Sequence, residues 1–559
     1  MEEIQEKLKK LVLELFSLEI EPEVVSAPEN TEADYASNIA MKLSKDLKRN
    51  PREIAEEIRE KYGENVEVAG PGFLNFKLSN GYYLNKLGDF TSNFSKNISL
   101  DEYLDKNVIC EFSDPNPFKV LHAGHLYTSV VGDAISRLFE YSGAKVTRAN
   151  FGGDVGLHVA KTIYALLYTK DSSEQMGELK IEDIAKAYVE GTRAYEEDDE
   201  AKKKITELNK EIYRINKENI REGEVAEIYW KGRELSYRYF DDFYAKIGVK
   251  FDKYYPESSV AELGLKTVRE QLKKGIYEVS DGAVVFDGEK FGLHTRVFIN
   301  QEGVPTYETK DVGLIFTKWA DYHFDKSVVI TGNEQLDYMK VVLKSIEQYA
   351  PELVEKTAHL THGLVKLPGN EKMSSRKGNF LKAVDVLDMV AQNMQSPAEE
   401  FEKLAENDKK IALSAVKYAF LKYKIGGDII FDPKESVKMT GNSGPYLLYS
   451  AVRAKKILKN ASNQSEITEE KGDLNEFEKK LIKKIVQYSE VLKEATNEMA
   501  PHKVCNYLYE VAQEFSRFYE NCPVVGSESE AIRIKLVEMY LKTMEHGFNL
   551  LGIEVPDEM

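Results

Sequence analysis

The sequence has few cysteines and no long apolar run. Its 559 residues include three cysteines, Cys110, Cys505 and Cys522, which are widely spaced and form no CxxC pair. Neither a disulfide framework nor a zinc site is expected from them. No apolar run reaches the roughly 20 residues of a membrane-spanning helix, and the start MEEIQEKLKKLVLELF lacks the basic and apolar regions of a secretory signal. We therefore expect a cytoplasmic protein without a membrane partner.

Basic residues are also in deficit. The chain holds 76 Lys and Arg against 94 Asp and Glu, a formal net charge of -18. This balance argues against a broadly basic coat for nucleic acid and leaves room for local basic patches that face one partner. Apolar residues, in contrast, make up 42% of the chain. At this length they suffice for about three or four domains.

One stretch, Glu111 to Ile135, combines a strand, a turn and the start of a helix. We expect a buried strand at 106–112, a turn at 114–117 and a helix at 124–141 that Gly143 ends. The start of a helix offers unpaired backbone N–H groups and a partial positive charge to an anion. Three possible phosphate donors stand at this end: Lys119, His122 and His125. At this point an accidental histidine pair, or a metal pair one turn apart, remains an alternative.

The flanking pattern predicts a parallel sheet. Strand and helix signals alternate through 108–112, 124–141, 145–151 and 157–168, which is typical of parallel strands joined by helices. Ligands of such sheets bind beyond the carboxyl ends of the strands, where Glu111, Asn116, His122 and Asp154 would lie. Residues 172–244 are helical and highly charged, and we expect them to form an exposed insertion.

Polar residues follow later strand signals in the same way. Strands are expected at 249–255, 282–286 and 297–300, and Tyr307 and Asp311 then share one face of a helix. A strand at 327–330 is followed by Gln335, expected just inside a helix. A strand at 362–366 leads into the loop PGNEKMSSRKGN, residues 368–379. Lys372, Arg376 and Lys377 suit phosphate binding, although a solvated turn is the commoner explanation of such a loop.

The two ends of the chain differ from the middle. Residues 1–97 predict a small α+β unit with helices at 2–18, 38–47 and 51–62 and an alternating strand at 66–78. Its AGPG segment precedes Phe73 and indicates a turn or, alternatively, a place where another backbone approaches closely. Beyond Phe431 the strands stop, and helices are expected at 444–458, 475–499, 502–519 and 530–551. Tyr446 and Arg453 bring an aromatic and a basic group to the first of these helices, which suits stacking and phosphate contact; the alternative is that the aromatics form core.

These motifs, in this order, resemble class I aminoacyl-tRNA synthetases, with HAGH in place of HIGH and KMSSR in place of KMSKS. EFSDPNPFKVLHAGHL is similar to the arginyl-tRNA synthetase signature, as are TYETKDVG and GNEQLDYMK. DYASNIA with AGPGFLNF resembles that family's N-terminal tRNA-binding domain, and GNSGPYLLYSAVRAKKIL with HGFNLLGIEVPDEM its DALR anticodon domain. The resemblance covers essentially the whole chain.

The resemblance implies an α/β protein of three domains. These are a small α+β tRNA-binding domain at 1–97, a Rossmann-type parallel-sheet catalytic domain at 98–437 with a helical insertion at about 172–245, and an all-α DALR anticodon-binding bundle at 438–559. The implied activity is arginine activation by ATP, with Mg²⁺ accompanying ATP, then transfer to the 3′-terminal ribose of tRNA(Arg), which releases AMP and pyrophosphate. Partners are then L-arginine, ATP and tRNA(Arg), activation can require bound tRNA, and we expect a monomer.

The resemblance also assigns residues. The ATP-binding set is His122, Gly124, His125, Lys372, Met373, Ser374 and Ser375, and the catalytic set is His122, His125, Lys119 and Lys372. Arginine would be bound by Glu111, Asp311 and Tyr307 at its side chain and by Asn116 and Gln335 at its α-amino and carboxylate end. The tRNA elbow would meet Phe73 and Asn75, and the anticodon loop Tyr446, Arg453, Tyr519 and Met559.

Three departures accompany the resemblance. Ser375 stands where the second KMSKS lysine is expected, GGDVGLH keeps Asp154 but has His158 in place of a glutamine, and Tyr338 stands where histidine is common. Two other functions remain to be weighed. Lysine or cysteine enzymes of the same class share HxGH and KMSS-like loops, and a catalytically silent tRNA-binding adapter would share the outer domains. The cysteine spacing and the Tyr307 and Asp311 pair speak against the first, and retention of both ATP motifs against the second.

Overall fold

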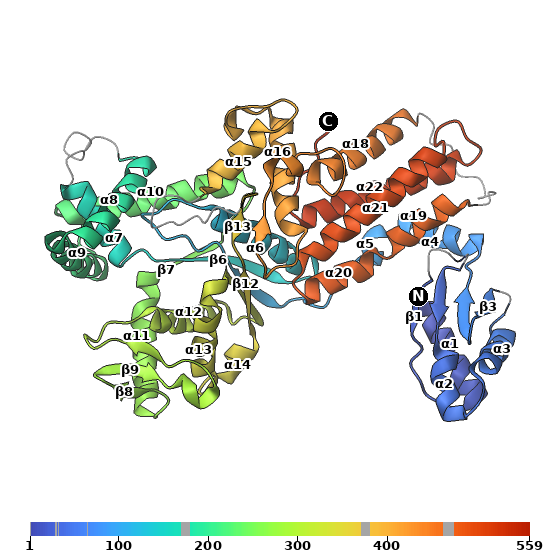
Figure 1. Cartoon of the computed structure of the whole chain (residues 1–559), viewed down its shortest axis with the longest axis horizontal. Coiled ribbons are helices and arrows are strands. Elements are labelled where there is room, and N and C mark those ends of the chain that lie inside the picture. Colours follow the sequence, from blue (N-terminus) through green and yellow to red (C-terminus); the bar gives the residue numbers. More distant parts are fainter. Residues whose placement is uncertain are drawn as a thin grey trace. The chain divides into compact units, whose positions relative to one another are not determined.

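The computed structural model describes residues 2–27, 31, 33–63, 65–168, 179–369, 381–461 and 474–559. The chain divides into two compact units (Figure 1). Unit 1 comprises Met1–Phe94, Asn463–Val486 and Phe518–Leu536, and unit 2 comprises Ser95–Ser462, Gln487–Arg517 and Val537–Met559. Among the described residues, no helix is long and apolar enough to cross a membrane.

Unit 1 contains the α+β arrangement that the N-terminal sequence predicts. Its helices are α1 (Glu2–Phe16), α2 (Ile39–Leu47), α3 (Pro51–Tyr62), α4 (Asn80–Ser92) and α19 (Glu476–Val486). Its strands β1 (Val24–Ser26), β2 (Tyr35–Ser37), β3 (Val66–Ala69) and β4 (Phe73–Phe76) form an antiparallel sheet in the order β1-β2-β4-β3. Helix α3 starts as expected, with Pro51 at its first position and the Asn50 side chain accepting a hydrogen bond from the Arg52 N–H at 2.9 Å.

The AGPG segment is both a turn and a place where another backbone approaches closely, the two alternatives that the sequence leaves open. It is the turn of the β3–β4 hairpin, so the single strand expected at 66–78 is split in two. Gly72 has a φ of +133°, and a Cβ there would lie 2.9 Å from the carbonyl carbon of Pro51. Only glycine allows both this backbone conformation and this close approach.

Unit 2 is built on a parallel sheet, as predicted, and its five strands lie in the order β12-β11-β5-β6-β7. The strands are β5 (Asn107–Glu111), β6 (Lys145–Gly152), β7 (Lys253–Pro256), β11 (Lys326–Gly332) and β12 (Thr357–His362). From β5 the chain first proceeds to β6 and β7 on one side and later fills β11 and β12 on the other. The reversal lies between β5 and β11, where the carboxyl ends of parallel strands form a binding crevice.

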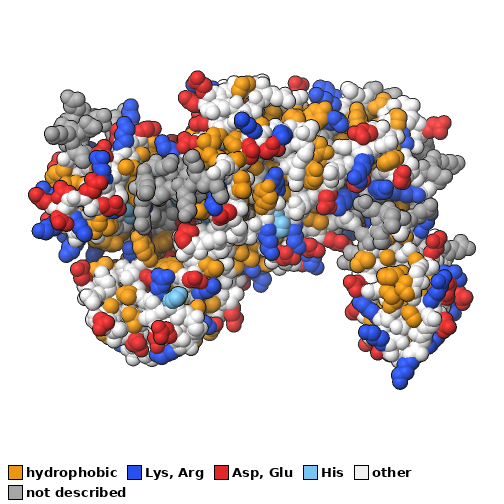
Figure 2. Space-filling view, viewed as in Figure 1, with side chains coloured by type: hydrophobic (Ala, Val, Ile, Leu, Met, Phe, Trp, Pro, Cys, Tyr) orange, Lys and Arg blue, Asp and Glu red, His pale blue; other side chains and the backbone are white. Residues whose placement is uncertain are grey.

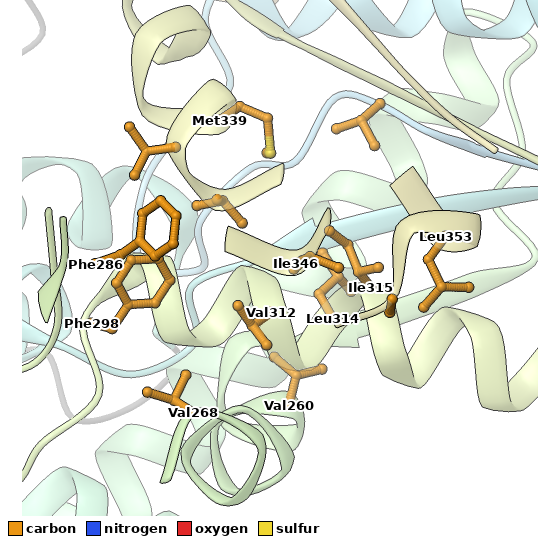
Figure 3. Close-up of a cluster of buried hydrophobic side chains, with 14 of the residues drawn as sticks. Val260, Val268, Phe286, Phe298, Val312, Leu314, Ile315, Met339, Ile346 and Leu353 are labelled. Atoms are coloured by element: carbon orange, nitrogen blue, oxygen red, sulfur yellow. The ribbon is translucent and has the colours of Figure 1, made fainter. Parts of the chain in front are cut away.

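Helices connect these strands and bury a large apolar core. They are α6 (Ala123–Tyr141), α7 (Leu157–Tyr168), α11 (Glu257–Lys273), α12 (Tyr307–Tyr322), α13 (Leu336–Glu347) and α14 (Pro351–Glu355), and the short α5 (Phe94–Asn97) precedes β5. A small antiparallel sheet of β8 (Glu278–Ser280), β9 (Ala283–Phe286) and β10 (Arg296–Ile299), with the short turn η1 (Gly288–Phe291), adjoins α11 and α12. Figure 3 shows side chains of α11, α12, α13, α14, β9 and β10 meeting in one cluster.

Helices α11 and α12 approach each other closely because both carry glycine at the contact. A Cβ on Gly264 would lie 2.0 Å from the Thr309 carbonyl oxygen, and one on Gly313 would lie 2.1 Å from that of Val260. Any side chain at either position would push the helices apart. The glycines therefore fix the depth at which α12, with Asp311, lies in the unit.

The insertion between β6 and β7 is helical as predicted, but it is not simply a solvated surface. It forms α8 (Ile181–Glu197), α9 (Asp199–Glu218) and α10 (Glu224–Lys246). One face of α9 is buried through Ile205, Leu208, Ile212 and Ile215, which pack in a core shared with α7. The charged residues of α9 occupy its other face.

The rest of the chain is mainly helical. Unit 2 continues with α15 (Ala383–Gln392), the turn η4 (Phe401–Lys403), α16 (Glu406–Leu421), α17 (Pro433–Ser436), α18 (Gly444–Asn460) and α20 (Tyr488–Asn497). Two long helices, α21 (Pro501–Asn521) and α22 (Glu530–Leu550), belong mostly to unit 2, while the end of α21 and the start of α22 fall in unit 1. The strand expected at 362–366 is the end of β12 followed by β13 (Val365–Lys366), which pairs with β14 (Ile429–Ile430). The single helix expected at 475–499 is interrupted at Gln487, giving α19 and α20.

Candidate functional site

The loop that follows β5 is held in place by the insertion. Three side chains of α10 bond it: Ser236 accepts from the Phe118 N–H at 3.0 Å, Tyr239 accepts from the Leu121 N–H at 3.3 Å, and the Tyr244 hydroxyl lies 2.8 Å from that of Ser113. The backbone of the loop has a positive φ at Ser113, Asp114 and Phe118, a conformation that costs energy unless its surroundings maintain it. The insertion therefore supports the signature loop, a role that its charged sequence did not indicate.

His122 and His125 shape the start of α6 through their Nδ1 atoms. His122 is the N-cap residue, and its Nδ1 accepts from the Gly124 N–H at 3.1 Å, while the Nδ1 of His125 accepts from the His122 N–H at 3.1 Å. The two rings stack with centroids 3.7 Å apart. Burial, with the nearby Lys119 charge, lowers the pKa of His122 to about 4 and that of His125 well below its usual range. Both rings are thus neutral at pH 7, and because Nδ1 accepts, Nε2 carries the proton that can be donated.

The backbone donors at this helix start are already used within the protein. The Ala123 N–H donates to the Leu381 carbonyl at 2.9 Å, and the His125 N–H to the His122 carbonyl at 2.9 Å. Together with the bond from Gly124, these contacts occupy the first turn. The expectation that unpaired backbone N–H groups face an anion here is therefore wrong. What this end of α6 offers is the helix dipole and the two imidazole N–H groups.

The residues after the KMSSR motif are bonded to the same helix start. His122 and Lys382 form an antiparallel bridge, and the Ala383 N–H donates to the Leu121 carbonyl at 3.0 Å. The motif residues Lys372, Met373, Ser374 and Ser375, with Arg376 and Lys377, lie outside the described residues. Their carboxyl-terminal flank nevertheless joins the HAGH helix directly.

A second group of polar residues surrounds a small cavity between helices α12 and α13 and strands β5, β11 and β12. The lining includes Glu111, Asp311, Lys318 and His359, and the volume of about 10 Å³ holds about one water molecule. Lys318 is fully buried and its Nζ lies 2.5 Å from Glu111 Oε2 and 3.2 Å from Ser327 Oγ. The charge of Glu111 is thus balanced inside the protein.

Asp311 is bonded differently. Its Oδ2 accepts a hydrogen bond from the Tyr338 hydroxyl, and among the described residues no Lys, Arg or His forms an ion pair with it. Burial, together with the charges of Glu111 and Glu257, raises the pKa of Asp311 to about 7. A permanently cationic group beside Asp311 would stabilise its ionised form.

A second buried ion pair stands beside Asp311. Lys310 pairs with Glu257, and its Nζ also lies 3.2 Å from the Tyr213 hydroxyl and 5.2 Å from the centroid of the Tyr307 ring. Tyr307 begins α12 and is 66% exposed. It shares the helix with Asp311, as predicted, but it lies at the surface while Asp311 is buried.

Sequence reasoning missed four residues of this region: Glu257, Lys310, Lys318 and, as a partner of Asp311, Tyr338. One signal was available. Lys318 interrupts the apolar run DVGLIFTKW, where a charged residue must either reach solvent or find a buried partner. The identity of that partner, 207 positions away, was not in the local pattern.

The remaining residues predicted to contact the substrate, Asn116, Gln335 and Lys119, are not among those that line this cavity. Asn116 Oδ1 accepts from the Gly153 N–H at 2.7 Å. Gln335 is exposed, and it ends the turn η2 (Asn333–Gln335) immediately before α13 instead of lying inside the helix. The Lys119 Nζ lies 5.0 Å from the ring centroid of Tyr188 on α8.

Asp154 and His158 have structural roles. Asp154 is fully buried and accepts hydrogen bonds from Arg233 Nε at 2.9 Å and from the N–H and hydroxyl of Ser258 at 3.0 and 2.8 Å. It therefore ties α10 to the start of α11. The His158 Nε2 bonds the Gly153 carbonyl at 2.8 Å, and burial lowers its pKa to about 3.

The residues assigned to RNA are divided between the units. In unit 1, Phe73 and Asn75 lie on one face of β4, with Phe73 39% exposed, and Tyr519 is 42% exposed. In unit 2, Tyr446 and Arg453 lie on α18, and Arg453 Nη2 donates to the Tyr449 hydroxyl at 3.0 Å. The last of the assigned residues, Met559, is half-buried in unit 2.

The surface carries both acidic and basic side chains, in keeping with the 94 acidic and 76 basic residues of the sequence. Acidic and basic side chains are interspersed on the face shown in Figure 2, with apolar side chains between them. Among the described residues, no group of three or more His, Cys, Asp or Glu side chains could hold a metal ion. All three cysteines are buried free thiols.

Three family models match the chain. The catalytic domain of class I tRNA synthetases (R) matches residues 92–433, the DALR anticodon binding domain residues 447–559, and the arginyl tRNA synthetase N-terminal domain residues 1–78. Among named relatives, an arginine–tRNA ligase of Borreliella burgdorferi is 30% identical over 555 residues and covers 95% of this chain and 93% of its own. One of Bacteroides thetaiotaomicron is 27% identical, with both chains fully covered.

Solved structures show the same fold. The arginyl-tRNA synthetase of Thermus thermophilus matches with a TM-score of 0.76 at 22% identity, covering 100% of both chains. That of Plasmodium falciparum matches with a TM-score of 0.78 at 22% identity, covering 100% of this chain and 99% of its own.

Proposed function

The chain belongs to the class I arginyl-tRNA synthetases, and from this premise we propose which of its residues perform the family's reaction. Members activate arginine with ATP and transfer it to tRNA(Arg), and this chain catalyses the same ligase reaction with ATP as a substrate. We assign tRNA elbow binding to residues 1–97, catalysis to 98–437 and anticodon binding to 438–559.

The proposed binding of arginine rests mainly on Asp311, because its buried carboxylate has no cationic partner among the described residues. The guanidinium of arginine is planar and permanently charged, and carboxylates match its fork of donors. Asp311 is the buried carboxylate whose ionised form still lacks a cationic partner among the described residues, whereas Lys318 already balances Glu111. Asp311 therefore supplies the negative charge that selects the guanidinium. Glu111 provides a second hydrogen-bond acceptor for the guanidinium. The exposed Tyr307 covers the arginine side chain from the surface.

The other end of arginine is held at the rim by Asn116 and Gln335. The Asn116 side chain is oriented by its bond from the Gly153 N–H, which occupies one lone pair of the amide oxygen and leaves its NH₂ group for the substrate carboxylate. Gln335 lies at the carboxyl end of β11, beside the reversal point of the sheet. Bound this way, the α-carboxylate faces the helix start at His122.

Activation joins the arginine carboxylate to the α-phosphate of ATP and expels pyrophosphate, with no covalent enzyme intermediate. The protein positions the reactants and stabilises developing negative charge. His122 and His125 donate through Nε2 to phosphate oxygens, and Gly124 allows the chain to start α6 there. Lys119 and Lys372, with Met373, Ser374 and Ser375, bind the departing pyrophosphate. The bridge between His122 and Lys382 supports a common site for the two motifs.

Mg²⁺ is proposed to enter with ATP, because this ion is usually bound through substrate phosphates with one or two carboxylates. It would neutralise charge on the phosphates. The chain is proposed to act as a monomer in the cytoplasm. Light scattering coupled to size-exclusion chromatography tests the oligomeric state.

The tRNA contacts remain those of the sequence assignment. Phe73 and Asn75 bind the elbow, and Tyr446, Arg453, Tyr519 and Met559 the anticodon loop. Activation is proposed to depend on bound tRNA. The cavity beside Asp311 holds about one water molecule, so arginine requires it to widen, and tRNA binding is the event proposed to widen it.

The test of the arginine site compares Asp311→Asn with Asp321→Asn. Asp321 serves as the control because it lies on the same helix and also accepts from a tyrosine, Tyr255, at 2.9 Å, but it does not line the cavity and is already paired with Lys253 at 3.3 Å. Removing one partner of a buried charge pair costs about 2–5 kcal/mol, so kcat/KM for arginine falls at least about thirtyfold in Asp311→Asn and little in Asp321→Asn. Exchange of pyrophosphate into ATP with tRNA present measures this. An unchanged value in Asp311→Asn refutes the assignment.

Amino-acid identity is tested separately by charging total tRNA with a panel of labelled amino acids. Arginine alone is expected to be attached. Attachment of lysine or cysteine would place the chain's activity elsewhere in the class, and attachment of none would favour an adapter.

A further inference from the structure

The hydrogen bond between Tyr338 and Asp311 joins two neighbouring helices at the arginine cavity. Tyr338 lies in the first turn of α13, and its hydroxyl donates to Asp311 Oδ2 on α12. The ring of Tyr338 packs against the core that contains Val312 and Met339. Its position is therefore fixed by packing, and the hydroxyl is held where it reaches one oxygen of the carboxylate.

Most other charged groups around Asp311 have partners of their own. The exception is Asp114 in the loop after β5, which has no ion pair among the described residues and whose pKa is raised well above its usual range by burial and by the charge of Glu111. Glu111 on β5 pairs with Lys318 on α12, and Glu257 on α11 pairs with Lys310. Glu308 of α12 pairs with Arg296 of β10 at 3.7 Å, and Arg296 lies 5.8 Å from the Tyr338 ring. His359 of β12 lines the same cavity but bonds Thr331 at 2.7 Å. Among the described residues, Tyr338 is the side chain that bonds Asp311 directly.

We propose that Tyr338 is a positioning residue for arginine recognition: its hydroxyl fixes the plane of the Asp311 carboxylate and keeps that group ionised for the guanidinium. This inference rests on the proposed role of Asp311. It adds a residue that acts through Asp311, without contact to the reacting atoms.

Two physical effects support this role. A carboxylate with one oxygen held by a donor cannot rotate freely, so its second oxygen, Oδ1, keeps one direction for the incoming N–H groups. A hydrogen bond donated to a carboxylate also favours its charged form. Burial raises the pKa of Asp311 to about 7 even with this bond present, so loss of the bond raises it further and leaves the group mostly protonated at neutral pH.

The direction in which KM for arginine changes with pH follows from these two effects. Arginine binds the ionised carboxylate, so KM for arginine rises as pH falls through the pKa of Asp311. A variant without the hydroxyl begins this rise at a higher pH. At sufficiently alkaline pH the carboxylate is ionised in both proteins, and the difference in KM shrinks to the part caused by orientation.

The experiment measures KM for arginine and kcat in aminoacylation, with saturating ATP and tRNA, from about pH 6 to about pH 9, a range that spans the raised pKa. Tyr338→Phe is compared with Tyr255→Phe, which removes the equivalent hydroxyl from Asp321 on the same helix. A hydrogen bond to a charged group contributes about one to two pKa units. Tyr338→Phe is therefore expected to raise KM about tenfold or more at pH 7 and to shift its pH profile upward, with kcat within about twofold. Tyr255→Phe should match the wild type.

A second variant keeps the test valid if the phenylalanine variant folds poorly. Incorporation of 3-fluorotyrosine at position 338 preserves the ring but makes its hydroxyl a stronger donor. The rise in KM is then expected at a lower pH than in the wild type, a shift that damage to the fold would not produce. Superimposable profiles for wild type, Tyr338→Phe and the fluorinated protein overturn the inference, as does an equal shift in Tyr255→Phe.

Asp311→Asn, assayed in parallel, separates the two claims. If it lowers kcat/KM for arginine while the Tyr338 variants leave the profile unchanged, the inference fails and the arginine site stands. If Asp311→Asn has no effect, the arginine site itself is refuted and the inference with it.

Discussion

Replacing Lys318 with methionine is expected to destabilise the catalytic part of unit 2 by about 3–5 kcal/mol, the usual cost of leaving a buried charge without its partner. The side chains of Lys318 and Glu111 are 1% and 4% exposed, so solvent does not screen them. At their separation of 2.5 Å and an effective dielectric constant of about 20, the gross attraction is about 7 kcal/mol. Methionine avoids the desolvation cost of lysine, which offsets part of this loss.

Thermal unfolding measures the effect. For a domain of about 150–250 residues, 1 kcal/mol corresponds to about 2–4 °C, so Lys318→Met should lower the transition of the catalytic part by about 6 °C or more. Lys340→Met is the control, because Lys340 forms an exposed pair with Asp337 at 3.0 Å, and such pairs contribute little. The double variant Glu111→Gln with Lys318→Met removes both charges and should recover most of the loss. A single variant that melts with the wild type, or a double variant less stable than the single, would refute the reasoning.

Three further predictions concern packing, pH and RNA. Gly264→Ala places a methyl group against the Thr309 carbonyl and should destabilise the protein by about 1–3 kcal/mol, measured by thermal melting. Burial lowers the pKa of His122 to about 4 and of His158 to about 3. As pH falls, these histidines therefore take up protons in the unfolded chain before they do so in the folded one, and the melting temperature should fall as pH drops from about 6.5 toward 4. A melting temperature that does not change over this pH range would contradict neutral buried rings. Arg453→Ala should raise KM for tRNA without changing KM for arginine, and equal pyrophosphate exchange with and without tRNA would contradict the proposed dependence of activation on tRNA.

The elements with strong local signals were predictable. The strand at Glu111 and the helix at His122 are marked by an apolar run, a proline-containing turn and a helical period, and the structure places them within one or two residues of expectation. The interruption at Gln487 was not predictable, because no glycine or proline marks it and the apolar period continues on both sides. Tertiary packing, which overrides local helix propensity, causes the break.

The site was predictable only in part. Motif residues such as His122 and Asp311 could be named from the sequence, but their partners are distant in the chain and have no motif of their own. Lys318 finds Glu111 across 207 positions, and Tyr338 reaches Asp311 from the next helix. The buried face of α9 was readable in principle, since its apolar residues recur at helical spacing, yet the many charges of the segment concealed it.

The bond from the Ala123 N–H to the Leu381 carbonyl has a consequence for synthesis of the chain. Helix α6 is translated long before Leu381, so during translation its first donor has no acceptor from that segment. Contacts of such long sequence separation form late, because the entropy of closing the intervening chain must be met first. The proposed nucleotide site is therefore completed only after β11, β12 and their helices have been made and folded. A truncated chain that ends before residue 381 would keep the local cap made by His122 and His125 but would lack the acceptor of the Ala123 N–H and the bridge between His122 and Lys382.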